Sequence, residues 1–340
     1  MMPQALIADQ PMPAGAADRR AFDQWTAPVA ADLAAAEEIF QAELASRVRH
    51  VQELVHHLAH YRGKQLRPTL LLLAARACGH VTREHHVLAA VVEMIHTATL
   101  VHDDILDGAS LRRHVPTIHA RWGNHSGVLL GDLLFTHAFY LASTTGSTLA
   151  CKIIGEATNR VCEGELHQIG EAGNLDLSAA EYFDMISGKT AALTACATQL
   201  GAIFSGTTES VVESLTHFGH DLGMAFQIAD DVLDLTGSEA EVGKSLGTDL
   251  GQRKLTLPLI HLLATGDEAQ RQRLRAVLLA GPESLDELVR LLRDSGVLAT
   301  TVATAERYAA QARNHLRAVG SSPSRDILER LTFEVIHRRS

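Results

Sequence analysis

The chain has 340 residues, with 30 Lys and Arg against 40 Asp and Glu, which gives a formal charge of −10 at neutral pH. Proteins that bind nucleic acid usually carry a basic surplus, so the charge argues against that class. With 46% hydrophobic residues the chain can form a core, which argues against a disordered protein. Aromatic residues make up 4% of the chain, so we expect a core of aliphatic side chains.

Residues 1–18 contain three prolines and little hydrophobic pattern, and we expect a loose tail before one domain over residues 19–340. No apolar run bounded by basic residues occurs there, so no secretory signal is predicted. The four cysteines form no C-x-x-C pair, which is typical of reduced thiols in a cytoplasmic protein. The longest apolar stretches are short or contain Glu93 and His96, so no membrane span is predicted.

The distribution of proline and glycine predicts helices. No proline occurs between Pro116 and Pro258, and this part is rich in Ala and Leu without alternation of apolar and polar residues. Thr82, Ser178 and Ser284 are typical residues for helix starts, and Ser178 has a glutamate three positions later as in a capping box. Single glycines or small groups mark the expected junctions between helices at 146, 170, 173, 201, 206 and 237. The sequence therefore predicts an all-α fold of long helices.

Two acidic motifs of the form D-D-x-x-D occur at residues 103–107 and 230–234, each after an apolar helical run. On a helix, residues i and i+4 lie one turn apart on the same face, so each motif can offer paired carboxylates to one cation. Carboxylates select a hard ion such as Mg²⁺, which shares its coordination shell with phosphate oxygens. A single motif is more typical of a solvated helix start or a loop than of a metal site. Its recurrence favours a metal site.

Basic residues accompany both acidic motifs. The segment 63–68 opens a helix, where backbone N–H groups together with Lys64 and Arg67 could hold an anion. Each basic residue alone is more typical of a solvated surface. Beside two acidic motifs, they indicate phosphate groups held between Mg²⁺ and cationic side chains. The remaining members of this set are Arg112, Arg113, Lys189 with Thr190, Lys244 and Lys254.

In order along residues 60–260, these segments resemble the motifs of the trans-isoprenyl diphosphate synthases, also called polyprenyl synthetases. The family usually has two glycines before the first lysine, an arginine after it, and a glycine after the arginine pair. Here Arg62, Gln65 and His114 depart from that pattern. The matching segments are G-K-x-x-R-P (63–68), HTATLVHDDILD (96–107), RR (112–113), GD (131–132), GKT (188–190), FQIADDVLD (226–234) and residues 243–258.

The resemblance implies an isoprenoid synthase fold of mostly antiparallel helices around a deep central cavity, with the two acidic helices facing each other at its mouth. It implies an enzyme that joins isopentenyl diphosphate head to tail to an allylic diphosphate, with three Mg²⁺ per active site, working as a homodimer. Loss of diphosphate leaves an allylic cation, which the double bond of isopentenyl diphosphate attacks, so no side-chain nucleophile is required.

The resemblance also implies roles for single residues. Mg²⁺ would be bound by Asp103, Asp104, Asp107, Asp230 and Asp231, with Asp234 in support. The allylic diphosphate would be held by Arg112, Lys189, Thr190, Gln227, Lys244 and Lys254. Isopentenyl diphosphate would be held by Lys64, Arg67, His96 and Arg113. The candidate catalytic residues are Asp103, Asp104, Lys189, Asp230 and Asp231.

Product length follows from the same resemblance. In the family, a bulky aromatic residue four or five positions before the first acidic motif stops chain growth early. Here these positions hold Thr99 and Ala98, and the motif lacks the two-residue insertion of many short-chain bacterial enzymes. The resemblance implies an all-trans product of C30 or more, handed to a membrane, and Ala98→Phe is expected to shorten it.

Other functions fit part of the pattern. A short-chain synthase would make C15 to C20 products. A class I terpene cyclase also begins by Mg²⁺-assisted loss of diphosphate, but its second motif is usually of an Asn/Ser/Glu type. A non-catalytic subunit of a heteromeric synthase commonly lacks one acidic motif.

Two further groups have partial metal-site spacing. His56, His57 and His60 lack an acidic or cysteine partner nearby, and we expect them to be solvated or to pack. Residues 162–167, which include Glu165, are expected to lie on a helix surface.

Overall fold

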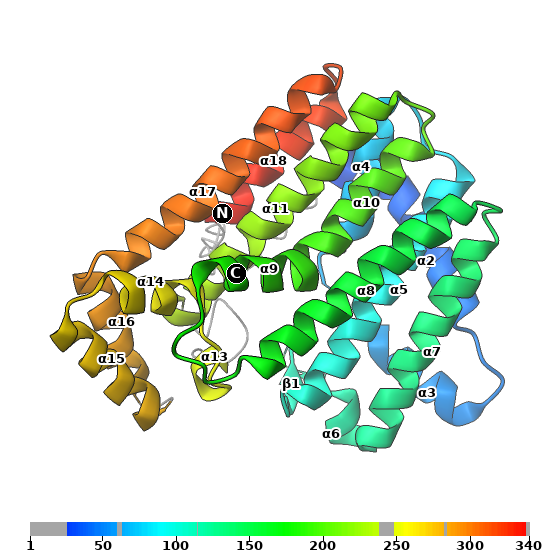
Figure 1. The fold of residues 1–340 in the computed structure, drawn as a ribbon. Coiled ribbons are helices and arrows are strands. Elements are labelled where there is room, and N and C mark those ends of the chain that lie inside the picture. The colour runs from blue at the N-terminus through cyan, green and yellow to red at the C-terminus, as the bar shows by residue number, and fades with distance from the viewer. Residues whose placement is uncertain (1–25, 60–62, 114, 238–247, 282–283, 338–340) are drawn as a thin grey trace, which may run out of the picture.

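The computed structural model describes residues 26–59, 63–113, 115–237, 248–281 and 284–337. Its longest elements are helices that lie side by side (Figure 1). The first half of the chain forms η1 (Ala27–Val29), α2 (Ala30–Glu43), α3 (Arg49–Leu58), α4 (Leu66–Cys78), α5 (Arg83–Leu106), α6 (Ile118–Trp122), α7 (Asn124–Ser143) and α8 (Thr148–Gly170). The second half forms α9 (Ala179–Ile186), the π-helical turn η3 (Ser187–Ala191), α10 (Ala192–Ile203), α11 (Glu209–Thr236), α13 (Thr248–Gly251), α14 (Leu257–Thr265), α15 (Glu268–Ala280), α16 (Leu285–Asp294), α17 (Val297–His315), η5 (Leu316–Ala318) and α18 (Pro323–His337).

The helices form two layers. One layer contains α17, α11, α10, α8 and α7 as successive neighbours, and the other contains α18, α4, α5 and α2 (Figure 1). The layers meet mainly where α10 packs on α4 and where α5 packs on α7. The prediction of an all-α fold is therefore confirmed. None of the described helices is both long and apolar enough to cross a bilayer.

One short hairpin interrupts the helices directly after the first acidic motif. Strand β1 (Leu111–Arg112) pairs antiparallel with β2 (Val115–Pro116), with Arg112 opposite Val115. The pair Arg112 and Arg113 thus lies in this hairpin. Arg113 has a φ of 51°, in the left-handed region that a tight turn requires.

The helix starts follow local chemistry in two of the three predicted places. Thr82 and Ser178 each form a reciprocal capping box, with His85 and Glu181 respectively. Ser284 does precede α16, but its hydroxyl donates to the carbonyl oxygens of Val277 and Gly281 and so caps the preceding helix.

The glycine at 201 is not a junction, because it lies inside α10. A Cβ atom at this position would clash with the carbonyl oxygen of Leu71. The lack of a side chain at Gly201 therefore allows α10 to pack closely on α4.

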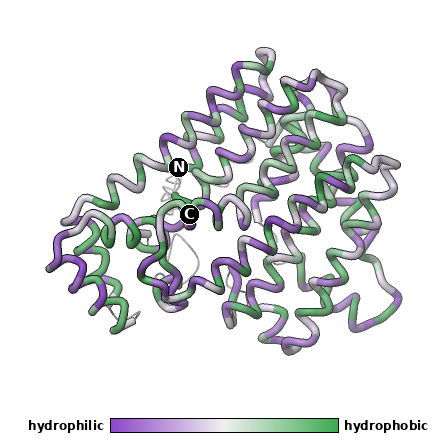
Figure 2. Tube along the Cα trace, viewed as in Figure 1, coloured by the Kyte–Doolittle hydropathy of each residue, from purple (hydrophilic) through white to green (hydrophobic). Residues whose placement is uncertain are grey.

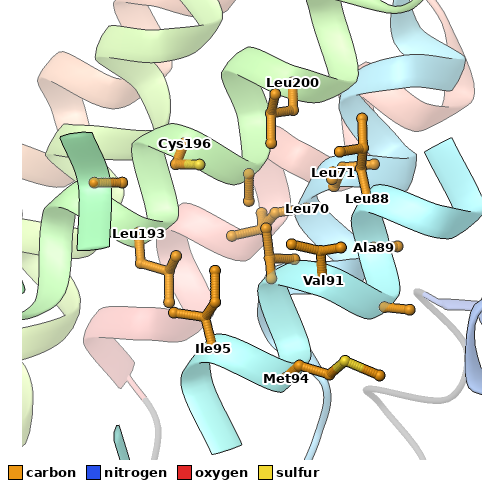
Figure 3. Packing of buried hydrophobic residues seen from close by; sticks show 14 of the residues in the cluster. Leu70, Leu71, Leu88, Ala89, Val91, Met94, Ile95, Leu193, Cys196 and Leu200 are labelled. Carbon is orange, nitrogen blue, oxygen red and sulfur yellow. The ribbon is translucent and has the colours of Figure 1, made fainter. Parts of the chain in front are cut away.

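The core is aliphatic, as the composition predicts. Phe218 is the largest of the fully buried side chains, and the others of large volume are Leu, Ile and Met. Figure 3 shows Leu88, Val91 and Ile95 of α5 meeting side chains of α4 and α10. Figure 2 shows hydrophobic and hydrophilic residues alternating along the helices, as expected when one side of each helix is buried. A second cluster joins α9, α11 and α14–α17, and Tyr308 and Ile336 contact both clusters.

Candidate active site

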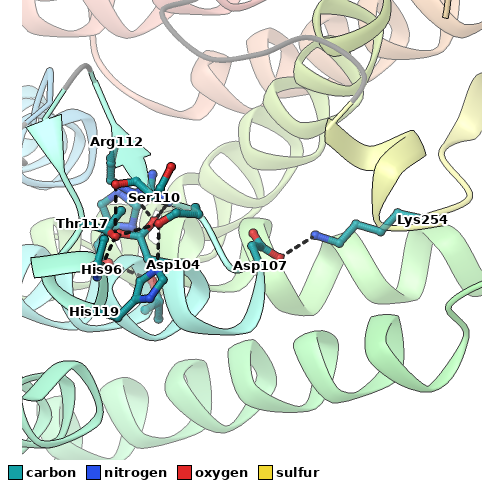
Figure 4. A network of polar contacts seen from close by, with 11 residues as sticks. His96, Asp104, Asp107, Ser110, Arg112, Thr117, His119 and Lys254 are labelled. Carbon is teal, nitrogen blue, oxygen red and sulfur yellow. Dashed lines mark hydrogen bonds and ion pairs between the residues drawn. The ribbon is translucent and has the colours of Figure 1, made fainter. Parts of the chain in front are cut away.

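The first acidic motif stands at the end of α5, and its three aspartates have different environments. Asp104 is 1% exposed, and its Oδ1 accepts hydrogen bonds from Nε and Nη2 of Arg112, each at 2.8 Å. The other oxygen, Oδ2, is buried and has no hydrogen-bond partner among the described residues. Asp107 terminates the helix, and its Oδ1 lies 3.2 Å from Nζ of Lys254, 147 positions later in the chain (Figure 4).

The carboxyl group of Asp103 has a raised pKa, which its burial and its charged neighbours explain. Burial raises the pKa of this carboxyl group to about 6, and the negative charges of Glu165 and Asp107 act in the same direction. Lys189 and Arg112 partly oppose the rise in pKa. A cation beside Asp103 would favour its charged form.

The second acidic motif lies in the last turns of α11. Both oxygens of Asp231 accept hydrogen bonds inside the protein, Oδ2 from the Tyr182 hydroxyl at 2.6 Å and Oδ1 from Nε2 of Gln227 at 2.8 Å. Burial raises the pKa of Asp231, and the nearby Asp249 adds to the rise. Asp234 is 2% exposed and accepts from the backbone N–H of Asp249 at 3.3 Å. Asp230 is partly exposed.

The turn η3 links the two acidic motifs. Lys189 forms an ion pair with Glu165 of α8, and its Nζ donates to Oε1 of Gln168 at 2.9 Å. The Thr190 hydroxyl donates to Oε1 of Gln227 at 2.7 Å, and Gln227 in turn contacts Asp231. Lys189 also acts electrostatically on Asp103, so this one turn reaches both motifs.

A second group of basic side chains surrounds His96. Burial lowers the pKa of His96 well below its ordinary value, and the charges of Arg67, Arg112 and Arg113 lower it further. The imidazole is therefore neutral at pH 7 among three cations. Burial also lowers the pKa of Arg67, against the charge of Glu93. In the part of the chain that the structure describes, its buried Nε has no hydrogen-bond partner.

The segment before α4 contacts this group through Arg113. The guanidinium of Arg113 packs against the backbone of Gly63, where any Cβ atom would clash with it. Lys64 is the next residue after this contact. Lys64 itself is exposed. Gln65 adopts φ 48° at the N-cap of α4, a left-handed conformation that is uncommon for residues other than glycine.

Most of the predicted site residues are thus brought together, in two groups that share Arg112. Lys244 lies outside the described residues, as do Arg62 and His114. The sequence reasoning missed Gln168, Tyr182 and Asp249. It also placed Glu165 on a helix surface, which is wrong, because this side chain turns inward to Lys189 and is 15% exposed. The spacing of three between Glu165 and Gln168 is a signal that both share one helix face.

The two predicted chain-length residues face different ways on α5. Any Cβ atom at Gly127 or Gly131 of α7 would clash with Ile105 or His102, so this side of α5 faces α7. Ala98 lies one turn before His102 on the same side and is 0% exposed. Thr99 lies one turn before Asp103, is partly exposed, and donates its hydroxyl proton to the His96 carbonyl oxygen at 2.8 Å.

The histidine group at the end of α3 has protein partners. Nε2 of His57 lies 2.8 Å from the Pro116 carbonyl oxygen, and its ring meets Trp122 edge to face. His60 lies outside the described residues. Among the described residues, no three His, Cys, Asp or Glu side chains are close enough to hold a metal ion by themselves.

The helical layers, together with two acidic motifs joined through cationic side chains, define an isoprenoid synthase. The family description "Polyprenyl synthetase" matches residues 48–294, and the chain belongs to this family of prenyltransferases. It is 34% identical over 311 residues to the octaprenyl diphosphate synthase of Escherichia coli, covering 91% of this chain and 96% of the relative. It is 37% identical over 314 residues to the all-trans-nonaprenyl-diphosphate synthase (geranyl-diphosphate specific) of Rhodobacter capsulatus, covering 92% and 96%.

Similarity extends to relatives with other product names. The short chain isoprenyl diphosphate synthase of Methanothermobacter thermautotrophicus is 34% identical over 287 residues, covering 83% of this chain and 88% of the relative. Among solved structures, the polyprenyl synthase of Caulobacter crescentus complexed with calcium and isoprenyl diphosphate has a TM-score of 0.89 and 35% identity, covering 94% of this chain and 98% of that one.

Proposed function

We propose that this prenyltransferase adds isopentenyl diphosphate repeatedly, head to tail, to an allylic diphosphate in a Mg²⁺-dependent reaction. The product is an all-trans chain of C30 or more. The observation that carries the proposal is the pairing of two basic groups at the first acidic motif. One group surrounds His96 and the other contains Lys189 and Lys254. Two substrates that each carry a diphosphate need two such groups side by side.

The carboxylates fit Mg²⁺. Asp104 has a buried oxygen without a hydrogen-bond partner among the described residues, and burial together with nearby negative charge raises the pKa of Asp103, which a cation would offset. Hard divalent ions take carboxylate oxygens and keep positions for water and phosphate, so neither motif has to form a complete cage. The Caulobacter relative, solved with calcium and isoprenyl diphosphate, supports a hard divalent ion together with a diphosphate ligand.

The six aspartates divide by exposure. Asp103, Asp107 and Asp230 are accessible, and we propose that they bind the three Mg²⁺ ions together with Asp104 and Asp231. When bound, Mg²⁺ supplies positive charge that stabilises the departing diphosphate. Asp104, Asp231 and Asp234 are buried, and their hydrogen bonds fix the ends of α5 and α11. Asp234 supports the five metal-binding carboxylates.

The basic residues hold the two diphosphates. Lys189, Lys254 and Arg112 stand beside the acidic motifs and bind the allylic diphosphate, together with Thr190, Gln227 and Lys244. As the C–O bond breaks, these cations stabilise the charge on the leaving group. Arg67 and Arg113, with neutral His96 and Lys64, hold isopentenyl diphosphate. Its double bond attacks the allylic carbon, and the departing diphosphate can take the proton.

A homodimer and a cytoplasmic location complete the proposal. Neighbouring helices α7 and α8 expose large apolar side chains, and a second copy of this chain would cover them. The four cysteines are free, in keeping with a reducing compartment. The exposed side chains are Val128, Leu129, Phe139 and Tyr140 on α7, and Leu149, Leu166 and Ile169 on α8.

The experiment combines the purified protein with isopentenyl diphosphate, Mg²⁺ and allylic primers of increasing length, and sizes the products. Products of C30 or more support the proposal, whereas C15 to C20 products identify a short-chain synthase. A hydrocarbon formed without isopentenyl diphosphate identifies a terpene cyclase. Turnover that requires a second protein identifies a subunit of a heteromeric synthase.

Variants test the acidic motifs directly. Asp104→Ala or Asp231→Ala should abolish turnover while circular dichroism shows intact helices. Asp326→Ala, at an exposed position of α18, is the control and should keep full activity. Rates close to the wild type in either site variant would remove the support for these assignments.

A further inference from the structure

A chain of polar contacts outside the diphosphate site connects four structural elements. Nη2 of Arg160 on α8 lies 2.9 Å from the hydroxyl oxygen of Ser187, the first residue of η3. That oxygen lies 3.0 Å from Nε2 of His220 on α11, and Nδ1 of His220 lies 3.1 Å from Oδ1 of Asp221. The other oxygen of Asp221 lies 3.2 Å from Nε2 of His315 on α17.

One assignment of protons satisfies every contact. The guanidinium of Arg160 donates to Ser187, whose hydroxyl donates to Nε2 of His220. Nδ1–H of His220 then donates to Asp221, which also accepts from His315. The first three bonds are oriented from Arg160 towards the carboxylate of Asp221, and bonds oriented this way strengthen one another. Ser187 therefore has a defined position between α8 and α11.

The backbone around Ser187 is held just as closely. A Cβ atom at Gly164 of α8 would lie 2.5 Å from the backbone nitrogen of Lys189, and one at Gly188 would lie 2.6 Å from the carbonyl oxygen of Arg160. On the opposite side, a Cβ atom at Gly223 of α11 would lie 2.7 Å from the Cα of Ala191. The π-helical turn thus fits between two helices at backbone distance, and π-helical turns are frequent at functional sites.

Lys189 and Thr190 leave this same turn two and three residues after Ser187. The glycine contacts set the distance of η3 from α8 and α11. These contacts contain no directional bond, so they do not by themselves fix the rotation of η3. The hydroxyl of Ser187 has the directional bonds that fix the rotation. A rotated turn would carry Lys189 away from Asp103 and Thr190 away from Gln227.

We propose that Ser187 and His220 are positioning residues that orient the turn η3 and so set the affinity for the allylic diphosphate. The inference rests on the proposed function, in which Lys189 and Thr190 bind that diphosphate. Neither Ser187 nor His220 touches the substrate. Arg160 and Asp221 terminate the contact chain and hold these two residues in place.

The test measures the KM for each substrate in Ser187→Ala, His220→Ala and the double variant, at saturating concentration of the other substrate. Loss of one hydrogen bond should raise the KM for the allylic diphosphate about 2-fold to 10-fold. The KM for isopentenyl diphosphate should stay unchanged. Because both residues act through one bond, the double variant should be no worse than the more affected single variant.

Two further variants separate positioning from general stability. His220→Gln places an amide near the position of Nε2 and should restore most of the affinity, and it also provides the test should Ser187→Ala fold poorly. Ser205→Ala is the matched control, because this hydroxyl, just beyond the far end of α10, also bonds across helices, to the Ala75 carbonyl oxygen at 3.2 Å. It should lower the melting temperature without changing either KM.

The outcomes are distinguishable from failure of the proposed function, which would show as a wild-type protein that makes no polyprenyl product. With an active wild type, an unchanged KM for the allylic substrate in both single variants would overturn the inference. Equal rises in both KM values, or additive effects in the double variant, would also overturn it, because they indicate general loosening of the fold.

Discussion

The two small residues on α5 give a sharp prediction about product length, because they face different surroundings. Thr99 is one helical turn, about 6 Å along the axis, from Asp103 on the same face, which is comparable with the length of one five-carbon unit. In Thr99→Phe, the ring would stand one helical turn before Asp103, beside the proposed site of the allylic diphosphate. We expect the product to fall to C15 or C20, with a loss of stability below about 1 kcal/mol, because the threonine side chain is partly exposed.

Ala98→Phe serves as the comparison. Ala98 is fully buried on the side of α5 that packs on α7, so a phenylalanine there overpacks the core and costs about 1–3 kcal/mol. Such a loss lowers the melting temperature by several degrees. Any shortening of the product by Ala98→Phe should therefore be accompanied by measurable destabilisation.

The assay sizes the products by thin-layer chromatography and records thermal unfolding of the same preparations. The wild type should give C30 or longer, and Thr99→Phe should give short products at a nearly unchanged melting temperature. If Thr99→Phe makes the wild-type product while Ala98→Phe shortens it without loss of stability, the hydrocarbon runs between α5 and α7. The assignment of the faces made above would then be wrong.

Further predictions concern the support of the second motif, the exposed apolar side chains and a buried thiol. Tyr182→Phe removes a bond to Asp231 worth about 1.5–3 kcal/mol, and should lower kcat in steady-state assays; an unchanged kcat would show that Asp231 needs no such support. Leu166→Glu on α8 should convert a dimer to a monomer in sedimentation, whereas Leu279→Glu on α15, which is 88% exposed, should not; an unchanged mass for Leu166→Glu would place the interface elsewhere. Burial raises the pKa of Cys196 to about 12, so this thiol should resist alkylation at pH 8 until the protein is denatured; rapid labelling of the folded protein would contradict its buried position.

Local signals in the sequence predicted much of the fold. Thr82 and Ser178 start helices through bonds made within one turn, and such bonds can be inferred from spacing alone. The spacing of four positions within each acidic motif likewise predicted which carboxylates share a helix face. Gly201 was misjudged because its small size serves a neighbour more than a hundred positions away in the chain, the carbonyl of Leu71. Sequence spacing contains no information about such an approach.

The site shows the same division between local features, which the sequence predicts, and contacts between distant residues, which it does not. The presence of Asp104 and Asp231 was predictable, but their burial was not, because it depends on Arg112 in a hairpin and on Tyr182 from another helix. Glu165 was expected on a helix surface because charged helical residues are mostly exposed, whereas its partner Lys189 comes from the distant π-helical turn. Pairings between distant elements decide these roles, and the sequence alone gives no measure of them.

Two ion pairs at the site bear on how tightly a diphosphate can bind. Lys189 has Glu165 as a partner, and Lys254 has Asp107. In the proposed function, an incoming diphosphate would compete with these two carboxylates, and its affinity would be the difference between two sets of contacts. The same competition would ease release of the diphosphate by-product, because the carboxylates would regain their cations after each round of extension.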